Sequence, residues 1–199
     1  IVVASLVPVS AVVAGANLQI DTQYPFSDSA RLSVSTQRSV LVRIRIPSWA
    51  VNATIDDKPA ANGTLVNWNC SPGNSTALIS LRPDVRIEQG WGAASSNAVA
   101  VVRGPLVFAL HPKEEKIVVR SYNTTPQSVG QQAPDYLVRT NEPWNFALVP
   151  DAGAVFVGQQ SSNWSINFPF DDTGSYPFAV NVTARRVPMW GYWRGSNIT

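Results

Sequence analysis

The sequence predicts an all-β protein, an antiparallel β-sandwich of jelly-roll character with little or no helix. Short runs rich in Val, Ile, Phe and Trp recur along the 199 residues, and clusters of Gly, Pro, Asn, Asp and Ser separate them. Such an alternation is typical of strands and turns. One run also alternates strictly between apolar and polar residues, and no long stretch has the residue spacing of an amphipathic helix.

The alternating run covers residues 40–46 and is the clearest strand. Its apolar residues fall on one face and its two arginines on the other: Val40, Val42, Ile44 and Ile46 against Arg43 and Arg45. A period of two is what a strand with one buried face needs. Pro47 should end the strand, because proline has no N–H to donate to a neighbouring strand.

Further strands are predicted wherever an apolar run lies between turn residues. They cover residues 17–21, 32–35, 77–81, 98–103, 106–110, 116–120, 145–149, 154–157, 164–168 and 178–184. Gly104-Pro105 should be a corner at which the chain changes sheet or direction. Residues 124–134 should form a long surface loop. We expect residues 1–199 to form one β-sandwich module, with a smaller β subdomain or a long insertion.

The charge pattern excludes one class of partner. Charged residues make up 14% of the chain and the formal net charge is +2, whereas a globular protein usually has about a quarter charged residues. The lysines and arginines are scattered, so we expect no nucleic-acid surface, which requires clustered cations. A chain so poor in charge needs another means of staying soluble.

Asparagine-linked glycans are the predicted means. Eight sequons of the form Asn-x-Ser/Thr are present: Asn52, Asn62, Asn69, Asn74, Asn123, Asn163, Asn181 and Asn197. A glycan is bulky and hydrophilic, so these asparagines should lie on the surface. The sequons predict a secreted, extracellular glycoprotein made in a eukaryotic secretory pathway. Asn69 is the weakest acceptor, because Pro72 follows closely and Asn74 competes for the same stretch.

The single cysteine and the first residues suggest a piece of a larger protein. Cys70 has no second cysteine in the chain, so it forms no internal disulfide and no thiolate metal site. The sequence starts at Ile1, and its apolar first residues are interrupted by Ser5, Pro8 and Ser10. That segment fits neither a signal peptide nor a membrane span of about 20 apolar residues, and we expect no membrane insertion.

No catalytic, cofactor or metal residue is predicted in this chain. His111 is the only histidine, and we expect it to be a solvent-edge residue rather than a ligand or a base. Glycosidases need two carboxylates that flank a bond. The adjacent acid pairs at 56–57, 114–115 and 171–172 fit solvated turns better, because neighbours on a strand point to opposite faces.

Seven tryptophans are an unusual share. Exposed indole rings stack on sugars, but tryptophan is also highly buried on average. We favour core or interdomain packing over sugar stacking, and keep four residues as candidates for contact with sugar or with another domain: Trp68, Trp164, Trp190 and Trp193.

Five segments, in order, carry a family resemblance. They are 21–26 (DTQYPF), 43–49 (RIRIPSW), 98–110 (AVAVVRGPLVFAL), 142–148 (EPWNFAL) and 184–190 (ARRVPMW). Together they resemble the beta-L-arabinofuranosidase family, glycoside hydrolase family 127, and its uncharacterised relatives. The chain departs from the family's turns at two places. The family usually has Trp followed by Gly-Asp, whereas Trp68 is followed here by residues 69–74 (NCSPGN), with a glycan acceptor in place of the Asp. Residues 56–59 (DDKP) stand where the family often has Asn-Gly.

The resemblance implies β-sandwich domains that follow an (α/α)6 barrel. In the family the barrel holds the active site, a cysteine nucleophile beside a zinc ion bound by cysteines and a glutamate. None of these residues has a counterpart here, and Cys70 lies in a stretch with turn-like composition. We therefore expect a non-catalytic accessory or structural β-sandwich of a secreted glycoside hydrolase-like glycoprotein, with the barrel as its partner and any zinc in that barrel. The alternatives are a structural glycoprotein of a cell wall or extracellular assembly, and a carbohydrate-binding module.

Overall fold

The fold is built from strands throughout the part of the chain that the structure describes. The computed structural model describes residues 1–90, 98–121, 134–149, 152–158, 178–193 and 196–198, with the backbone alone for 191–193 and 196–198. Within these ranges every regular element is a strand and no α-helix is present. The predicted all-β class is confirmed. The chain divides into two compact units, Ile1–Phe108 with Gly153–Val182, and Ala109–Ala152 with Thr183–Thr199.

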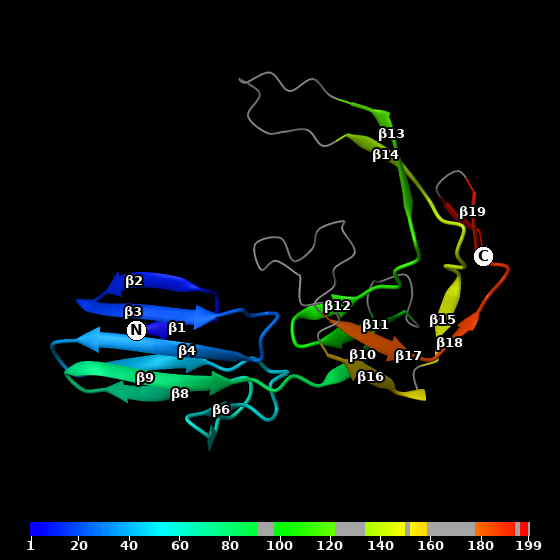
Figure 1. Ribbon diagram of the computed structural model, residues 1–199. Helices are drawn as coiled ribbons and strands as arrows, with labels where there is room; N and C mark the ends of the chain where they lie inside the picture. Colours follow the sequence, from blue (N-terminus) through cyan, green and yellow to red (C-terminus); the bar gives the residue numbers. More distant parts are fainter. Residues whose placement is uncertain (91–97, 122–133, 150–151, 159–177, 194–195, 199) are drawn as a thin grey trace. The chain divides into compact units, whose positions relative to one another are not determined.

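The first unit begins with a six-stranded antiparallel sheet. Its strands follow the order β2 (Val9–Val13), β3 (Ala16–Thr22), β4 (Ser29–Thr36), β9 (Gly73–Ser80), β6 (Thr54–Ile55) and β7 (Lys58–Pro59). Four of them, β2, β3, β4 and β9, lie side by side in Figure 1. The hairpin between β6 and β7 has Asp56 and Asp57 at positive φ of 49° and 61°, as a type I′ turn requires. The two aspartates thus form the hairpin for which the resembling family often uses Asn-Gly.

A second sheet of three strands faces the first. It contains β1 (Val2–Val3), β5 (Val40–Arg45) and β8 (Leu65–Cys70). β5 and β8 are antiparallel, whereas β1 pairs with β5 in parallel. This parallel pair is an exception to the antiparallel arrangement that the sequence predicts. Its cause is long-range, since it joins residues about forty positions apart, with the Ile1 ammonium also donating to the Leu41 carbonyl over 3.0 Å.

The core lies between these two sheets. Val42 and Ile44 of β5 are fully buried, as are Leu32 of β4 and Ile79 of β9, and all belong to one contiguous apolar cluster. Leu41, Arg43 and Arg45 of β5 are exposed. The predicted period of two at 40–46 is therefore confirmed, because side chains of one parity enter the core and those of the other enter solvent.

A further group of strands completes the first unit. β10 (Val85–Gln89), β11 (Val99–Arg103) and β12 (Leu106–Phe108) form an antiparallel sheet, and β16 (Ala154–Val157) pairs with β17 (Ala179–Val182). Gly104 and Pro105 form the two-residue turn between β11 and β12. The predicted change of direction is confirmed. Gly104 has a φ of +57°, which suits the first position of a type II′ turn.

The described residues of the second unit form three two-stranded pairings. They are β13 (Glu115–Arg120) with β14 (Asp135–Arg139), β15 (Phe146–Leu148) with β18 (Ala184–Arg186), and β19 (Gly191–Trp193) with β20 (Ser196–Ile198). Most side chains of β13 and β14 are exposed.

The predicted strands mostly match, with some corrections. The range 178–184 is two strands, β17 and β18, separated at Thr183. Cys70 does not lie in a turn: it ends β8 and pairs with Val40. The sequence analysis placed Cys70 in a turn because the turn-forming residues Ser71 and Pro72 follow it directly. The strands that the sequence did not predict are β1, β2, β6, β7, β8, β10, β14, β19 and β20. The predicted strand 164–168 and almost all of the predicted loop 124–134 lie outside the described residues.

Candidate functional site

The outer face of the six-stranded sheet has a shallow depression of about 340 Å³. Its lining comes from β2, β3, β4 and β9 and contains mainly hydroxyl and amide side chains. The lining residues are Ser10, Asn17, Leu18, Gln19, Ser33, Val34, Ser35, Asn74, Ser75 and Thr76. None of them is charged, and none is aromatic.

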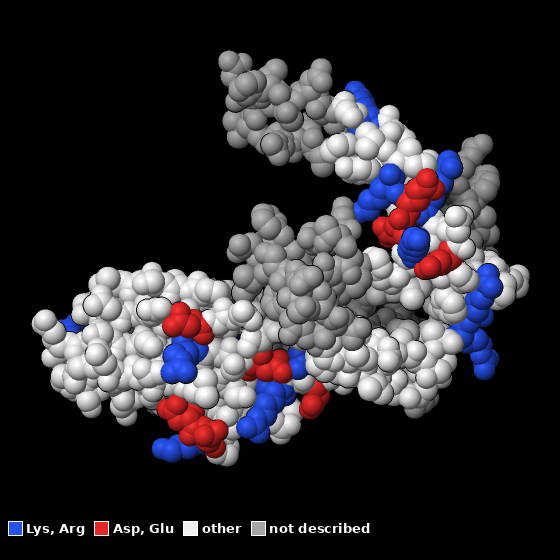
Figure 2. Space-filling view, in the orientation of Figure 1, with Lys and Arg blue, Asp and Glu red and all other residues white. Residues whose placement is uncertain are grey.

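Two cross-strand rows build this polar surface. Asn17 on β3 pairs with Ser35 on β4, which pairs with Asn74 on β9. The next row on the same face runs from Gln19 to Ser33 to Thr76. Neighbouring strands lie about 4.7–4.9 Å apart, so each row is a ladder of closely spaced donors and acceptors. Figure 2 shows a broad uncharged area over these strands, with a few charged side chains beside it.

Sequence reasoning missed this surface, although a signal was present. Each of the three strands alternates core residues with small uncharged polar residues. In β4, for example, Leu32 and Val34 are fully or almost fully buried, while Ser33 and Ser35 face outward. The alternation gives the two faces of each strand, but it does not say which strands lie side by side.

The predicted glycan acceptors lie on the surface wherever their side chains are described. Five are exposed: Asn52, Asn62, Asn69, Asn74 and Asn181. Asn123 and Asn163 lie outside the described residues, and Asn197 is described only as backbone in β20. Exposure is what an acceptor needs, and occupancy stays a prediction.

Asn69 and Asn74 lie on different sheets despite their closeness in sequence. Asn69 is on the outward parity of β8 in the three-stranded sheet, and Asn74 is on β9 in the six-stranded sheet. The short connection between these strands crosses from one sheet to the other, so the two acceptors lie on opposite outer faces of the sandwich.

The tryptophans divide between packing and exposure. Trp68 is half-buried and packs against the core cluster, as does Trp49. Trp190 is 41% exposed beside Met189, which is 85% exposed. Trp164 lies outside the described residues, and the side chain of Trp193 is not described. Of the four candidates for sugar or interdomain contact, Trp190 is the one whose described side chain is exposed.

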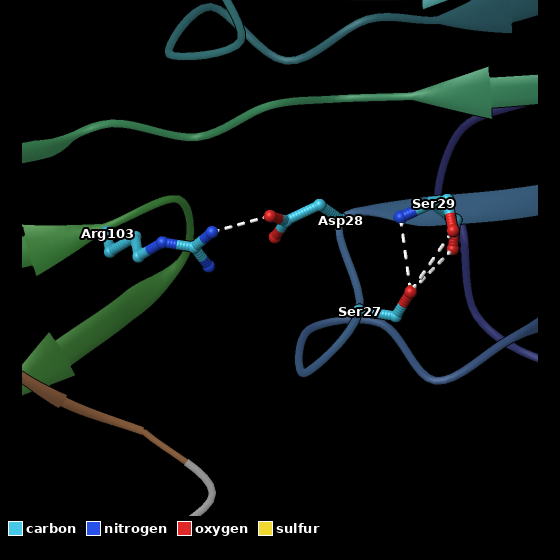
Figure 3. A network of polar contacts seen from close by, with 4 residues as sticks. All are labelled: Ser27, Asp28, Ser29 and Arg103. Carbon is cyan, nitrogen blue, oxygen red and sulfur yellow. Dashed lines mark hydrogen bonds and ion pairs between the residues drawn. The ribbon is translucent and has the colours of Figure 1, made fainter. Parts of the chain in front are cut away.

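Arg103, at the end of β11, is the most buried charged residue among the described part of the chain. It is 7% exposed and its Nη2 lies 2.5 Å from Asp28 Oδ2 (Figure 3). Its guanidinium carbon stacks 4.0 Å above the centroid of the Phe156 ring and lies 5.4 Å from that of Phe178. Phe26 completes the cluster, 6.2 Å from Phe178. The ion pair and the rings join β11 to the segment between β3 and β4.

The turn that presents Asp28 is held by local hydrogen bonds. Ser27 Oγ accepts from the Ser29 N–H at 3.2 Å (Figure 3). The Asp28 carbonyl accepts from the Leu81 N–H at 2.8 Å. These bonds fix the carboxylate on one side of a short turn, where it reaches Arg103.

A second close contact lies one residue after Arg103. A Cβ placed on Gly104 would lie 3.3 Å from Pro83 Cβ and 3.4 Å from Trp49 Cη2. Trp49 ends the segment RIRIPSW, so two of the segments that carry the family resemblance approach each other here. Glycine is required both by its positive φ and by this closeness.

In the second unit, Asn145 connects the two remaining resembling segments. It is 8% exposed, and its Nδ2 donates to the carbonyls of Val187 at 2.9 Å and Trp190 at 3.2 Å. The Val187 N–H donates back to the Asn145 carbonyl at 2.8 Å, and β15 pairs with β18 immediately beside these bonds. The buried amide thus holds the turn that carries the exposed Trp190.

The described titratable groups form no metal site. They include no cluster of three or more His, Cys, Asp or Glu side chains. Burial raises the pKa of the Cys70 thiol, which the Ser75 hydrogen bond lowers in part, and burial likewise raises the pKa of Tyr24 against the opposing charge of Arg45. A buried thiol with a raised pKa is a poor nucleophile and a poor ligand for zinc, so Cys70 does not fit the zinc chemistry of the resembling family.

Other predicted surface groups lie where expected. His111 is exposed, and so are both aspartates at 56 and 57 and both glutamates at 114 and 115, although Glu115 begins β13 instead of lying in a turn. Asp56 also stabilises its hairpin, since its Oδ1 accepts from the Leu78 N–H at 2.8 Å. The pair at 171–172 lies outside the described residues. A helix that could span a membrane is not found among the described residues.

Comparison with known proteins gives structural similarity only. No family model and no curated protein matches the chain. Similar solved structures include a glycoside hydrolase (17% identity, TM-score 0.41), a GH127 beta-L-arabinofuranosidase from Geobacillus stearothermophilus T6 (16%, 0.42) and a GH127 beta-arabinofuranosidase (15%, 0.38). The matches cover 63%, 69% and 66% of this chain, but 28%, 29% and 30% of the other chains. This chain therefore spans less than a third of those proteins.

Proposed function

We propose that this chain is a non-catalytic accessory β-sandwich of a secreted, glycosylated glycoside hydrolase-like protein. Its role is structural: it covers an apolar surface of a catalytic (α/α)6 barrel in the same protein and holds the loops around the sugar cleft. The catalytic residues, and any zinc, belong to that barrel.

The supporting observation is what the five resembling segments do in this fold. Phe26 of the first packs near Arg103 of the third through the ring of Phe178, and Trp49 of the second lies against Gly104 of the third. The fourth and fifth meet through Asn145 and the pairing of β15 with β18. The residues that carry the resemblance thus make the contacts that connect one strand to another. Such contacts are expected of a domain that contributes structural stability to a larger protein.

The glycoprotein part of the proposal is supported by the surface. The five described acceptors are exposed on three strands, β8, β9 and β17, and on connecting turns, and the chain has few charges to keep it soluble. Glycans at these positions would leave the core undisturbed, since each points away from the cluster between the sheets.

The test uses the complete reading frame that contains this chain, expressed in a secreting eukaryotic cell. We expect an encoded barrel, glycopeptides at the exposed sequons by mass spectrometry, and hydrolysis of a synthetic beta-L-arabinofuranoside by the whole protein but not by residues 1–199 alone. The matched control is the whole protein with Asn52→Gln, which should lose one glycan and keep its activity. A frame with no further domain, or a protein secreted without glycans, would overturn the proposal.

A carbohydrate-binding module is the second candidate, and the neutral polar depression on the six-stranded sheet is the described surface that it would use. That function requires saturable binding of a free oligosaccharide to unglycosylated protein, lost when the depression is altered. Titration calorimetry with neutral plant and algal oligosaccharides measures it directly.

A further inference from the structure

We propose that the depression on the six-stranded sheet is the seat of the protein's own glycan, attached at Asn74. The first sugars of that glycan lie along the rows of hydroxyl and amide groups instead of extending into solvent. This inference rests on the proposed glycosylation. It adds a defined binding site and a defined ligand, the N-acetylglucosamine core of an N-linked glycan.

Position is the first argument. Asn74 is itself a lining residue of the depression, and so are the other two residues of its sequon, Ser75 and Thr76. Its side chain is exposed on a strand paired along its whole length with β4. A glycan on Asn74 therefore starts inside the depression, with Ser35 and Asn17 beside it in the same cross-strand row.

Chemistry is the second argument. The side chains of Ser33 and Thr76 offer neutral donors and acceptors, the groups that pair with sugar hydroxyls and acetamides. Gln19 offers its amide oxygen and one N–H, since its Nε2 also donates to Asp21 Oδ1 at 2.8 Å. With a volume of about 340 Å³, the depression is at the small end of ligand sites, which usually measure about 300–1,000 Å³. No charged residue lines it, so an acidic or phosphorylated ligand would find no counter-ion there.

The absence of aromatic rings from the lining favours a tethered sugar over a free one. A neutral hydrogen bond on an open surface gains little, because it replaces bonds to water. A free ligand must in addition overcome the loss of its translational and rotational freedom on binding. A glycan already bonded to Asn74 has lost that freedom and is present at a high effective concentration. Weak polar contacts that cannot retain a free oligosaccharide can hold an attached one.

The test is the rate at which peptide-N-glycosidase releases each glycan from the secreted, folded protein, relative to the denatured protein. Two neutral hydrogen bonds should slow release at Asn74 roughly tenfold, since about 1.4 kcal/mol corresponds to a factor of ten. The double variant Gln19→Ala/Ser33→Ala keeps the sequon and removes two seat residues, and should restore fast release. Asn52, exposed in a turn and not among the lining residues of the depression, is the internal control and should be released at the same rate in both proteins.

Two further variants test the proposal if the double variant folds poorly. Thr76→Ser preserves both sequon and hydroxyl and should retain slow release, whereas Thr76→Ala removes the glycan. The Thr76→Ala protein is then titrated with free N,N′-diacetylchitobiose, and no saturable binding below millimolar concentration is expected.

The outcomes separate this inference from the proposed function. Slow release at Asn74 that the double variant abolishes supports the seat. An unoccupied Asn74, equal release at Asn74 and Asn52, or tight binding of free chitobiose overturns the seat but leaves a glycoprotein with its other sites. A protein with no occupied site overturns both.

Discussion

Replacing Asp28 should destabilise the protein more than replacing Arg103, its partner in the ion pair, and this difference can be measured. The Arg103 side chain is 8% exposed, whereas that of Asp28 is 39% exposed. Asp28→Ala would leave a buried guanidinium without its carboxylate. Arg103→Met would leave a carboxylate that is already partly hydrated and would fill the arginine's place with an apolar side chain of similar length. We therefore expect the aspartate variant to be the more destabilising of the two.

The expected losses of free energy of unfolding can be estimated from the contacts that each variant removes. Removing one partner of a buried pair costs about 3–5 kcal/mol when the remaining charge stays buried. We place Asp28→Ala near the lower end, at about 3 kcal/mol, because the guanidinium keeps the ring faces of Phe156 and Phe178, and such contacts stabilise a cation. Arg103→Met loses a cation–π contact of about 1–2 kcal/mol and a partly solvated ion pair of at most about 1 kcal/mol. Methionine regains packing against the rings, so we expect a net loss of about 1–2 kcal/mol.

Hydrogen exchange is the suitable assay, because a chain of two units need not unfold in one step. The amides of β11 and β4 report the opening free energy of the two segments that the pair joins. The double variant Asp28→Ala/Arg103→Met completes a thermodynamic cycle and should be less destabilised than the sum of the singles.

The reasoning is refuted if Arg103→Met destabilises β11 and β4 as much as Asp28→Ala or more. It is also refuted if the two single effects add without coupling, since residues at 2.5 Å that share a charge interaction must couple.

Three further predictions concern single positions. Gly104→Ala should lower stability by about 1–3 kcal/mol through its positive φ and its close neighbours, whereas Gly15→Ala, with an open surrounding, should show the smaller cost of φ alone in the same thermal melt. Asn145→Ala should cost about 1–3 kcal/mol by leaving buried carbonyls unpaired and should accelerate exchange of the Trp190 amide. Burial raises the pKa of Cys70, so its share of stability is complete below the unfolded thiol's pKa of about 8.5 and falls as pH rises through the folded pKa. Alkylation by iodoacetamide should accordingly be far slower in the folded protein than in urea.

Each of these predictions has a contrary result. Equal destabilisation at both glycines would mean that the packing around Gly104 contributes nothing. An unchanged exchange rate at Trp190 would show that the amide does not hold its turn. Equal alkylation rates in folded and unfolded protein would contradict the burial of Cys70, and a Cys70→Ser variant whose stability falls just as steeply above pH 8 would assign the pH effect to another group.

The alternation of apolar and polar residues predicted the strands that have one buried face and one solvent-exposed face. Residues 40–46 show this best, because the same alternation that identifies the strand also identifies its core face. The pattern failed at Cys70, since a strand that ends beside Ser71 and Pro72 has the composition of a turn. It also failed at β14, whose side chains are exposed on both faces, so that no alternation marks it.

Contacts between residues far apart in the sequence could not be predicted in the same way. The parallel pairing of β1 with β5 joins residues 41 positions apart, and the ion pair between Asp28 and Arg103 joins residues 75 positions apart. An arginine next to a glycine turn suggests a surface residue, and only the assembled fold buries it beneath two phenylalanine rings. The depression around Asn74 has the same origin, because its rows form only when three strands are in register.

The sequence by itself determined that this chain forms strands, which faces of the clearest ones enter a core, that its lysines and arginines are scattered along the chain, and which asparagines satisfy the acceptor rule. These are properties of neighbouring residues, so a linear pattern contains them. Tertiary structure alone decided which acceptor lies in a polar depression, which arginine is buried, and which segments of the family resemblance touch. Those depend on contacts between distant parts of the chain, whose free energy is gained only when the sheets come together in one register.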